Sequence, residues 1–230
     1  MTFEYKANPV VLSDNPSRED KQKYLGVRIL EEARITFLKK GYMATTVNEI
    51  AQRAEITKRT LYKYFPSKMA IYVEIFDLYL ANYHSALQKT ANLEMSTHEI
   101  LSRLLETQYL FVKDNEKFMR LFWVMNPEEY GGKVPDELVS SVQKWSYANF
   151  ELILPLIERG IEKGRYLSGI SAEDIVHITT SIIKGIFIHT NRELKFHKVR
   201  TSSDRVFKNL MVVLTEGLIK KRGVDPIGRS

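Results

Sequence analysis

The stretch that most constrains the fold is residues 45–68, whose pattern predicts two short helices joined by a tight turn. Thr46 is followed three residues later by Glu49, which is the S/T-x-x-E arrangement of an N-terminal capping box. A helix is therefore expected to begin at Thr46 and to run to about Arg53. The turn is expected to follow directly, at residues 54–56.

The second predicted helix is amphipathic. Thr57 can accept a hydrogen bond from a backbone N–H in its first turn, and the helix is expected to end near Tyr64. Leu61 and Phe65 lie four residues apart, so they share the face that docks against the preceding helices. The opposite face carries side chains of the kinds that contact bases and phosphates in a DNA major groove: Lys58, Arg59, Thr60, Tyr62 and Lys63.

Over residues 29–76 the chain resembles the DNA-binding region of the tetracycline-repressor (TetR) family of bacterial transcriptional regulators. The resemblance rests on two motifs, Thr46-Val47-x-x-Ile50-Ala51 and Thr57-x-x-Thr60-Leu61-Tyr62-x-Tyr64-Phe65-x-Ser67-Lys68. It implies an all-α protein, with an N-terminal three-helix helix-turn-helix DNA-binding domain and a larger C-terminal helical domain for ligand binding and dimerisation. A helix-turn-helix places its second helix in the major groove.

The expected DNA contacts fall into two sets. Side chains expected to read bases are Asn48, Lys58, Arg59, Thr60 and Lys63. Side chains expected to hold the phosphate backbone are Thr46, Tyr62, Tyr64 and Lys68. Lys68 belongs to the second set because it begins the next predicted helix, where an anion is favoured.

One position departs from the family pattern. Glu55 lies in the turn, where the family carries glycine because the residue adopts a positive φ. A glutamate there is expected to add backbone strain without preventing the turn.

The excess positive charge is confined to the same part of the chain. Residues 17–69 contain twelve Lys and Arg and six Asp and Glu, a net charge of +6, which equals the net charge of the whole chain. Phosphate neutralisation needs such a patch, and the binding that it supports weakens as salt rises. A basic face that is merely solvated is the competing interpretation.

Composition and spacing argue against several kinds of site. The chain has no cysteine, so it offers no disulfide and no thiolate ligand or nucleophile. Its five histidines show no H-x-x-x-H or H-E-x-x-H spacing, and neither a glycine-rich phosphate loop nor a G-x-S-x-G motif occurs. We therefore expect no enzyme activity, no cofactor and no metal site. Without a signal peptide or a long apolar run, a cytoplasmic protein with no membrane partner is expected.

Breaks in the helical pattern divide the chain into segments. Ser17 is expected to start the first helix and Gly41 to end it. A long helix is expected from Asp136 to Lys163, bent at Pro155, after a loop at residues 126–135. The expected division is an N-terminal arm (1–16), the helix-turn-helix domain (17–67), a connecting helix (68–94), a ligand-binding and dimerisation domain (95–222) and a C-terminal tail (223–230).

The last predicted helix, from about Ser203 to Lys221, is apolar nearly all round and must be covered on two sides. The resemblance implies that it and the preceding helix, which begins after Ser171, pair with their two-fold mates in a homodimer. Such a dimer would present two recognition helices to a palindromic double-stranded operator. Residues expected at that interface are Ile182, Ile186, Val206, Leu210, Val213, Leu214 and Leu218.

Residues that combine large apolar area with polar groups are candidates for lining a pocket, which suits a small hydrophobic or aromatic effector. They are Tyr109, Phe122, Trp123, Asn126, Trp145, Tyr147, Asn149, His177 and Thr180. Ordinary core packing is the competing interpretation of each aromatic residue among them.

The sequence therefore predicts a dimeric, sequence-specific transcriptional regulator, a repressor that a small ligand releases from its operator. Two alternatives stay open on the sequence alone. A ligand-independent architectural protein would keep the DNA-binding domain, whereas a helical protein-interaction module would use the basic domain to bind an acidic partner.

Overall fold

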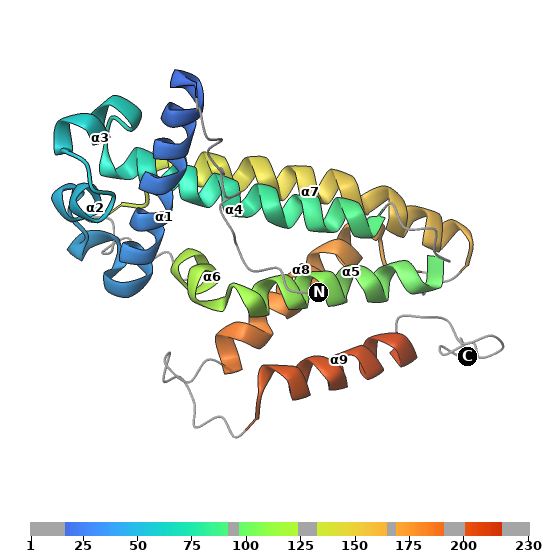
Figure 1. Ribbon diagram of the computed structural model, residues 1–230. Coiled ribbons are helices and arrows are strands. Elements are labelled where there is room, and N and C mark those ends of the chain that lie inside the picture. Colours follow the sequence, from blue (N-terminus) through green and yellow to red (C-terminus); the bar gives the residue numbers. More distant parts are fainter. Residues whose placement is uncertain (1–16, 92–96, 124–132, 165–168, 191–200, 218–230) are drawn as a thin grey trace, which may run out of the picture. The chain divides into compact units, whose positions relative to one another are not determined.

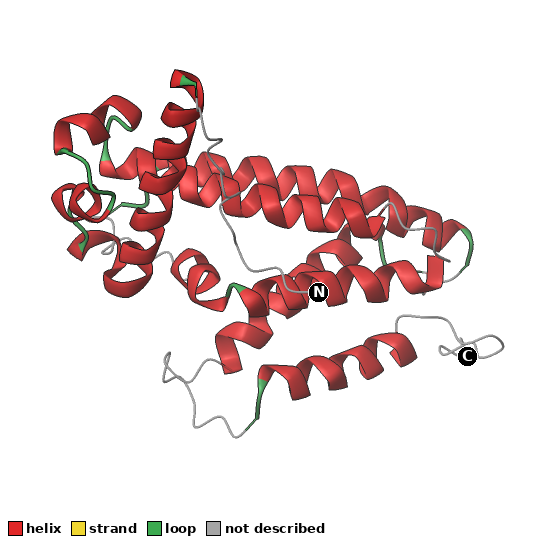
Figure 2. Cartoon of the chain, viewed as in Figure 1, coloured by secondary structure: helices red, strands yellow, loops and turns green. Residues whose placement is uncertain are grey.

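The structure is a computed structural model, which describes residues 17–91, 97–123, 133–164, 169–190 and 201–217. All regular secondary structure in these residues is helical, as Figure 2 shows, so the predicted all-α fold class is confirmed. None of the described helices combines the length and the apolar character that crossing a membrane requires.

Two compact units are formed by the contacts within the chain (helices labelled in Figure 1). Within the described residues, the first contains 17–82, 117–123 and 133–145. The second contains 83–91, 97–116, 146–164, 169–190 and 201–217. The domain limits expected from the sequence stay a prediction.

The first helix of the helix-turn-helix domain, α1 (Arg18–Ala44), has the predicted cap and the predicted break. The Ser17 side chain accepts a hydrogen bond from the N–H of Asp20, and the Asp20 carboxylate accepts one from the N–H of Ser17. Gly41 has φ 81°, which interrupts the helix, and one further turn follows it. The backbone therefore changes direction just before α2.

The two short helices α2 (Val47–Arg53) and α3 (Lys58–Tyr64) have nearly the predicted limits. Thr46 Oγ1 accepts the N–H of Glu49 at 3.2 Å, and Thr57 Oγ1 accepts the N–H of Thr60 at 3.1 Å. Both helices pack on α1 through a small core in which five side chains are 0% exposed: Ile29, Ala33, Ile50, Ala54 and Leu61. This core holds α3 with its cationic face outward.

The turn between α2 and α3 contains Glu55, whose φ is 54°. The positive φ predicted at this position is thus confirmed. The turn is closed by a hydrogen bond from the N–H of Ile56 to the carbonyl oxygen of Ala51 at 2.9 Å, and the Glu55 carboxylate lies 2.6 Å from the guanidinium of Arg28. Glu55 therefore adopts a conformation that favours glycine.

Replacing Glu55 with glycine is expected to stabilise the protein by up to about 1 kcal/mol, because it removes the Cβ strain of a left-handed residue. The ion pair with Arg28 is lost, but the Glu55 side chain is 77% exposed and such pairs contribute little. Urea unfolding measures the change. Glu55→Gln is the control, since it removes the ion pair and keeps the strain. A midpoint below that of the wild type for Glu55→Gly would show that the ion pair outweighs the strain.

Aromatic rings join α1 to α4 (Lys68–Ala91) within the first unit. The ring of Tyr72, 1% exposed, lies 5.0 Å from Phe37, 4.9 Å from Tyr42 and 4.8 Å from Phe76 between centroids. Phe76 continues the contact to Phe118 of α6 (Glu116–Trp123) at 4.6 Å. One apolar cluster therefore packs α4 against both α1 and α6.

A single carboxylate joins α4 to α7 (Asp136–Glu162) in the same unit. Asp77 accepts hydrogen bonds from Ser141 Oγ at 2.8 Å, from Trp145 Nε1 at 2.8 Å and from Lys144 Nζ at 3.3 Å. Burial alone would raise the pKa of Asp77, but these three donors and the charge of Lys144 outweigh it and lower the pKa. Asp77 is therefore a charged acceptor at the junction of two helices.

The second unit contains α5 (Thr97–Asp114), α8 (Ala172–Thr190) and α9 (Ser203–Gly217), with parts of α4 and α7. Tyr109 of α5 lies between two rings, 5.3 Å from Phe187 of α8 and 3.9 Å from Phe207 of α9. Its hydroxyl donates to Asp204 at 2.7 Å, and burial raises the pKa of this phenol. Tyr109 of α5 therefore contacts both α8 and α9.

Candidate nucleic-acid interface

Three cations of α3 lie on its solvent face. Lys58, Arg59 and Lys63 are exposed and, within the described part of the chain, none of them forms an ion pair. The Lys58 ammonium lies 5.7 Å from the ring centroid of Tyr62, which is 43% exposed. This helix therefore presents charge that no carboxylate of the described residues neutralises.

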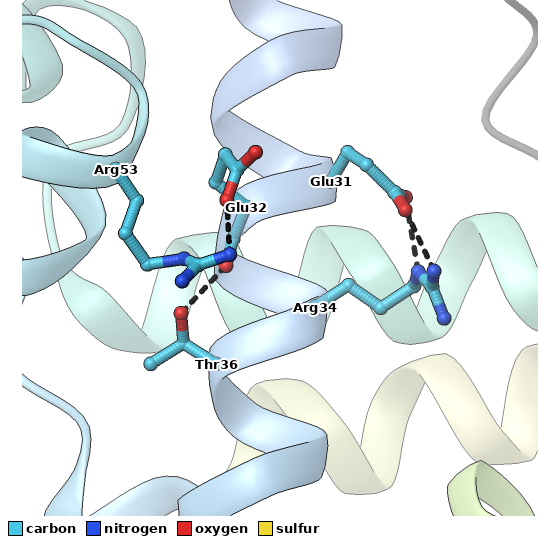
Figure 3. A network of polar contacts seen from close by, with 5 residues as sticks. All are labelled: Glu31, Glu32, Arg34, Thr36 and Arg53. Atoms are coloured by element: carbon cyan, nitrogen blue, oxygen red, sulfur yellow. Dashed lines mark hydrogen bonds and ion pairs between the residues drawn. The ribbon is translucent and has the colours of Figure 1, made fainter.

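Four cations of α1 and α2, Arg28, Arg34, Lys40 and Arg53, differ from those of α3, because they pair with acids of the same domain. The pairs between these helices and the turn are Arg28–Glu55 at 2.6 Å, Lys40–Glu49 at 2.6 Å and Arg53–Glu32 at 2.8 Å. Figure 3 shows Arg53 reaching Glu32 of α1, and Arg34 pairing with Glu31 along the same helix at 2.6 Å. The hydrogen bond from Lys40 lowers the pKa of Glu49, and that from Arg28 to Glu55 raises the pKa of Arg28.

The remaining expected DNA contacts are placed around this cationic face. Thr46 and Asn48 are exposed at the start of α2, whereas Tyr64 is half-buried at the end of α3, beside Gly26. Thr60 is half-buried, and its hydroxyl lies 2.9 Å from that of Thr57. Their roles toward DNA stay predictions.

Lys68 differs from the other cations expected to contact DNA. Its ammonium donates to the backbone carbonyl oxygens of Tyr42 at 2.7 Å and Thr45 at 2.8 Å, and burial lowers its pKa. These contacts direct the ammonium toward the end of α1.

The expected pocket residues are dispersed over both units. Trp145 donates to Asp77, Tyr147 is 67% exposed, and His177 and Thr180 are exposed on α8. Asn149 of α7 bonds His84 of α4 through its Oδ1 and the ring Nδ1, at 2.8 Å. The side chains of Phe122 and Trp123, and all of Asn126, lie outside the described residues. Whether any of these residues lines a pocket stays a prediction.

The expected dimer residues differ in exposure. Ile186 and Leu214 are buried within the protomer, at 6% and 7%, whereas Val213 is 65% exposed. Ile182, Val206 and Leu210 are half-buried, and Leu218 lies outside the described residues. Sequence reasoning missed two exposed apolar residues on the same helices, Ile178 at 40% and Val212 at 51%.

Sequence reasoning also missed two polar residues, one on α4 and one on α5. Asp77 interrupts the apolar stripe of α4, which was a visible signal, although nothing in the sequence names its donors. Gln108 of α5 is 3% exposed. In the sequence it lies at helical spacing from Leu104, Leu105 and Val112, and a polar residue within such an apolar stripe is the signal that could have marked it.

Comparison with known proteins identifies the family that the helix-turn-helix segment matches. The family profile described as "Bacterial regulatory proteins, tetR family" matches residues 29–75. The icaADBC biofilm operon negative transcriptional regulator IcaR of Staphylococcus aureus is 31% identical over 114 residues, which span 46% of this chain and 58% of that protein.

Solved structures extend the similarity of fold to most of the chain. A Saccharomonospora viridis protein in complex with choline has a TM-score of 0.72 at 18% identity, covering 87% of this chain and 100% of that one. The fatty acid degradation regulator FadR from Bacillus halodurans has a TM-score of 0.68 at 16% identity, covering 84% and 95%. On the profile match and the helix-turn-helix geometry together, residues 29–75 form a DNA-binding domain of the tetR family of bacterial regulatory proteins.

Proposed function

We propose that this transcriptional regulator is a homodimeric repressor, which binds a palindromic operator and leaves it when a small ligand binds. The observation that carries the DNA-binding part is the contrast between helices. Acids of the helix-turn-helix domain pair with Arg28, Lys40 and Arg53 of α1 and α2, whereas all three cations of α3 are exposed and outside any ion pair of the described residues. Phosphates and guanine edges are the partners that such a helix face suits.

Exposed apolar side chains on α8 and α9 support the homodimer. Ile178, Val212 and Val213 are 40%, 51% and 65% exposed, and apolar side chains at these positions gain by burial against a partner. A two-fold dimer would present two α3 helices to major grooves one or more helical turns apart on a palindrome, at about 34–36 Å per turn. The similarity to IcaR, a negative regulator, supports repression.

Buried polar groups of the second unit support a ligand site there. Gln108 is 3% exposed on α5, and the His84–Asn149 pair joins α4 to α7. A few polar groups within apolar surroundings are typical of sites for small, mostly hydrophobic molecules. The choline complex and the fatty acid regulator of the same fold support a ligand-responsive domain of this kind.

Arg59→Ala tests the recognition helix. Arginine binds guanine through two hydrogen bonds, so its loss is expected to weaken binding to the selected operator by about 1–3 kcal/mol and to relax specificity at one base pair. Fluorescence anisotropy measures the affinity for the operator and for a scrambled duplex, and the ratio of the two affinities gives the specificity. Arg205→Ala, which removes an exposed arginine of α9, is the control and is expected to change neither affinity. Equal losses on both duplexes would contradict the base-reading role.

Selection of bound duplexes from a random library tests the function as a whole. A palindromic motif bound by a dimer is the expected result. Salt-sensitive binding to every duplex without enrichment would favour the ligand-independent architectural protein. Binding to no duplex would favour the protein-interaction module.

A further inference from the structure

The ammonium of Lys68 is enclosed by backbone carbonyl groups. It donates to the oxygens of Tyr42 at 2.7 Å and Thr45 at 2.8 Å, and it lies 3.5 Å from that of Met43. The same ammonium lies 4.2 Å from the ring centroid of Tyr42, a cation–π distance. Lys68 itself is half-buried. An ammonium has three N–H donors, and these contacts occupy them.

The break at Gly41 explains why carbonyl groups gather there. Because Gly41 has φ 81°, the residues that follow it form a separate short turn instead of continuing the helix. The carbonyl oxygen of Tyr42 accepts the N–H of Thr45 at 3.3 Å, and Thr45 itself is 1% exposed, so water has little access to the Thr45 carbonyl group. The Lys68 ammonium, on the first residue of α4, donates to both carbonyl oxygens.

We propose that Lys68 serves DNA binding as a positioning residue, whose ammonium fastens the start of α4 to the junction between α1 and α2, rather than as a phosphate ligand. The inference rests on the proposed DNA-binding function. Thr45 is directly followed by Thr46, the N-cap of α2, so the orientation of α4 at Lys68 determines where α2 begins. This role replaces the phosphate contact expected from the sequence.

Salt dependence separates the two roles. A cation that neutralises one phosphate contributes about 0.9 to the slope of log association constant against log salt concentration. Lys68→Met is therefore expected to weaken duplex binding at every salt concentration while leaving that slope unchanged. Lys63→Met, which removes an exposed positive charge of α3, is the matched control and is expected to lower the slope by up to about 1, because a cation on the face toward the duplex releases counterions even where it also contacts a base.

Thermal unfolding of the full chain provides the second measurement. Lys68→Met removes the ammonium that donates to the carbonyl oxygens of Tyr42 and Thr45, so its midpoint is expected to fall by about 5 °C, whereas Lys63→Met is expected to keep the wild-type midpoint. If the methionine variant fails to fold, Lys68→Arg is measured instead, because it keeps the positive charge. A bulky planar guanidinium fits this carbonyl cluster poorly, so a lower midpoint with an unchanged slope is expected, although arginine binds phosphate well.

Two results would overturn the proposal. One is a slope lowered by about 1 in Lys68→Met with a wild-type unfolding midpoint. The other is a Lys68→Arg variant with wild-type midpoint and affinity. Failure of the wild type to bind any duplex would instead refute the proposed function, and the unfolding midpoints would still test the contact between Lys68 and the end of α1.

Discussion

Replacing Tyr72 with alanine is expected to lower the free energy of unfolding by about 3–5 kcal/mol, the range for deleting a fully buried aromatic side chain. Tyr72 is 1% exposed and its ring contacts Phe37, Tyr42 and Phe76 at 4.8–5.0 Å between centroids. The cavity cannot close easily, because its walls are themselves large rings on two different helices. Urea unfolding followed by far-UV circular dichroism measures the loss.

Tyr72→Phe is the matched control for this prediction. It keeps the ring and its three neighbours and removes only the hydroxyl, so a cost below about 1.5 kcal/mol is expected. If the alanine and phenylalanine variants lost the same free energy, the ring contacts would not be the source of the stability. The operator affinity of Tyr72→Ala is also expected to be lower than that of the wild type, because Tyr72 packs α4 against the end of α1.

Replacing Asp77 with alanine is expected to cost about 2–4 kcal/mol of unfolding free energy. Three hydrogen bonds to a charged acceptor are lost. The hydroxyl of Ser141, a buried residue, and the indole N–H of Trp145, a half-buried one, lose that partner. Asp77→Asn keeps one carbonyl acceptor and is expected to lose less. Equal costs for the two variants would show that the acceptor oxygens do not stabilise this junction.

The stability that Asp77 contributes is expected to depend on pH. Its pKa is lower in the folded protein than in the unfolded chain, so between these two pKa values the unfolded chain binds more protons. The contribution is complete above pH about 4 and is lost as pH falls through the folded pKa. Unfolding midpoints of the wild type and Asp77→Asn should therefore converge as pH falls below about 4. A constant difference over this range would contradict a charged Asp77.

Helix limits in the DNA-binding domain could be predicted because their causes are local. The caps at Thr46 and Thr57 each use an N–H three residues away, and the break at Gly41 follows from one residue's conformational freedom. The positive φ of Glu55 was predictable from the family pattern of the turn. In each case a few neighbouring residues carry the whole signal.

The partners of polar side chains could not be predicted, because they lie far apart in the sequence. Lys68 meets Tyr42 across 26 residues, Trp145 meets Asp77 across 68, and Tyr109 meets Asp204 across 95. Residue type alone suggested a phosphate contact for Lys68 and pocket positions for Trp145 and Tyr109. In the structure each of them uses its polar group within the protein, a contact that periodicity and composition do not encode. Their roles toward phosphate or ligand stay predictions.

The paired hydroxyls of Thr57 and Thr60 have a consequence for the operator. Their oxygens lie 2.9 Å apart, and Thr57 Oγ1 already accepts the N–H of Thr60. If Thr60 turns its proton toward Thr57, its oxygen can accept from the amino group of adenine or cytosine. If Thr57 donates instead, the proton of Thr60 can point to a keto oxygen of guanine or thymine. Rotation of two hydroxyl protons exchanges these states without moving α3, so the aligned operators should be degenerate at the base pair facing Thr60.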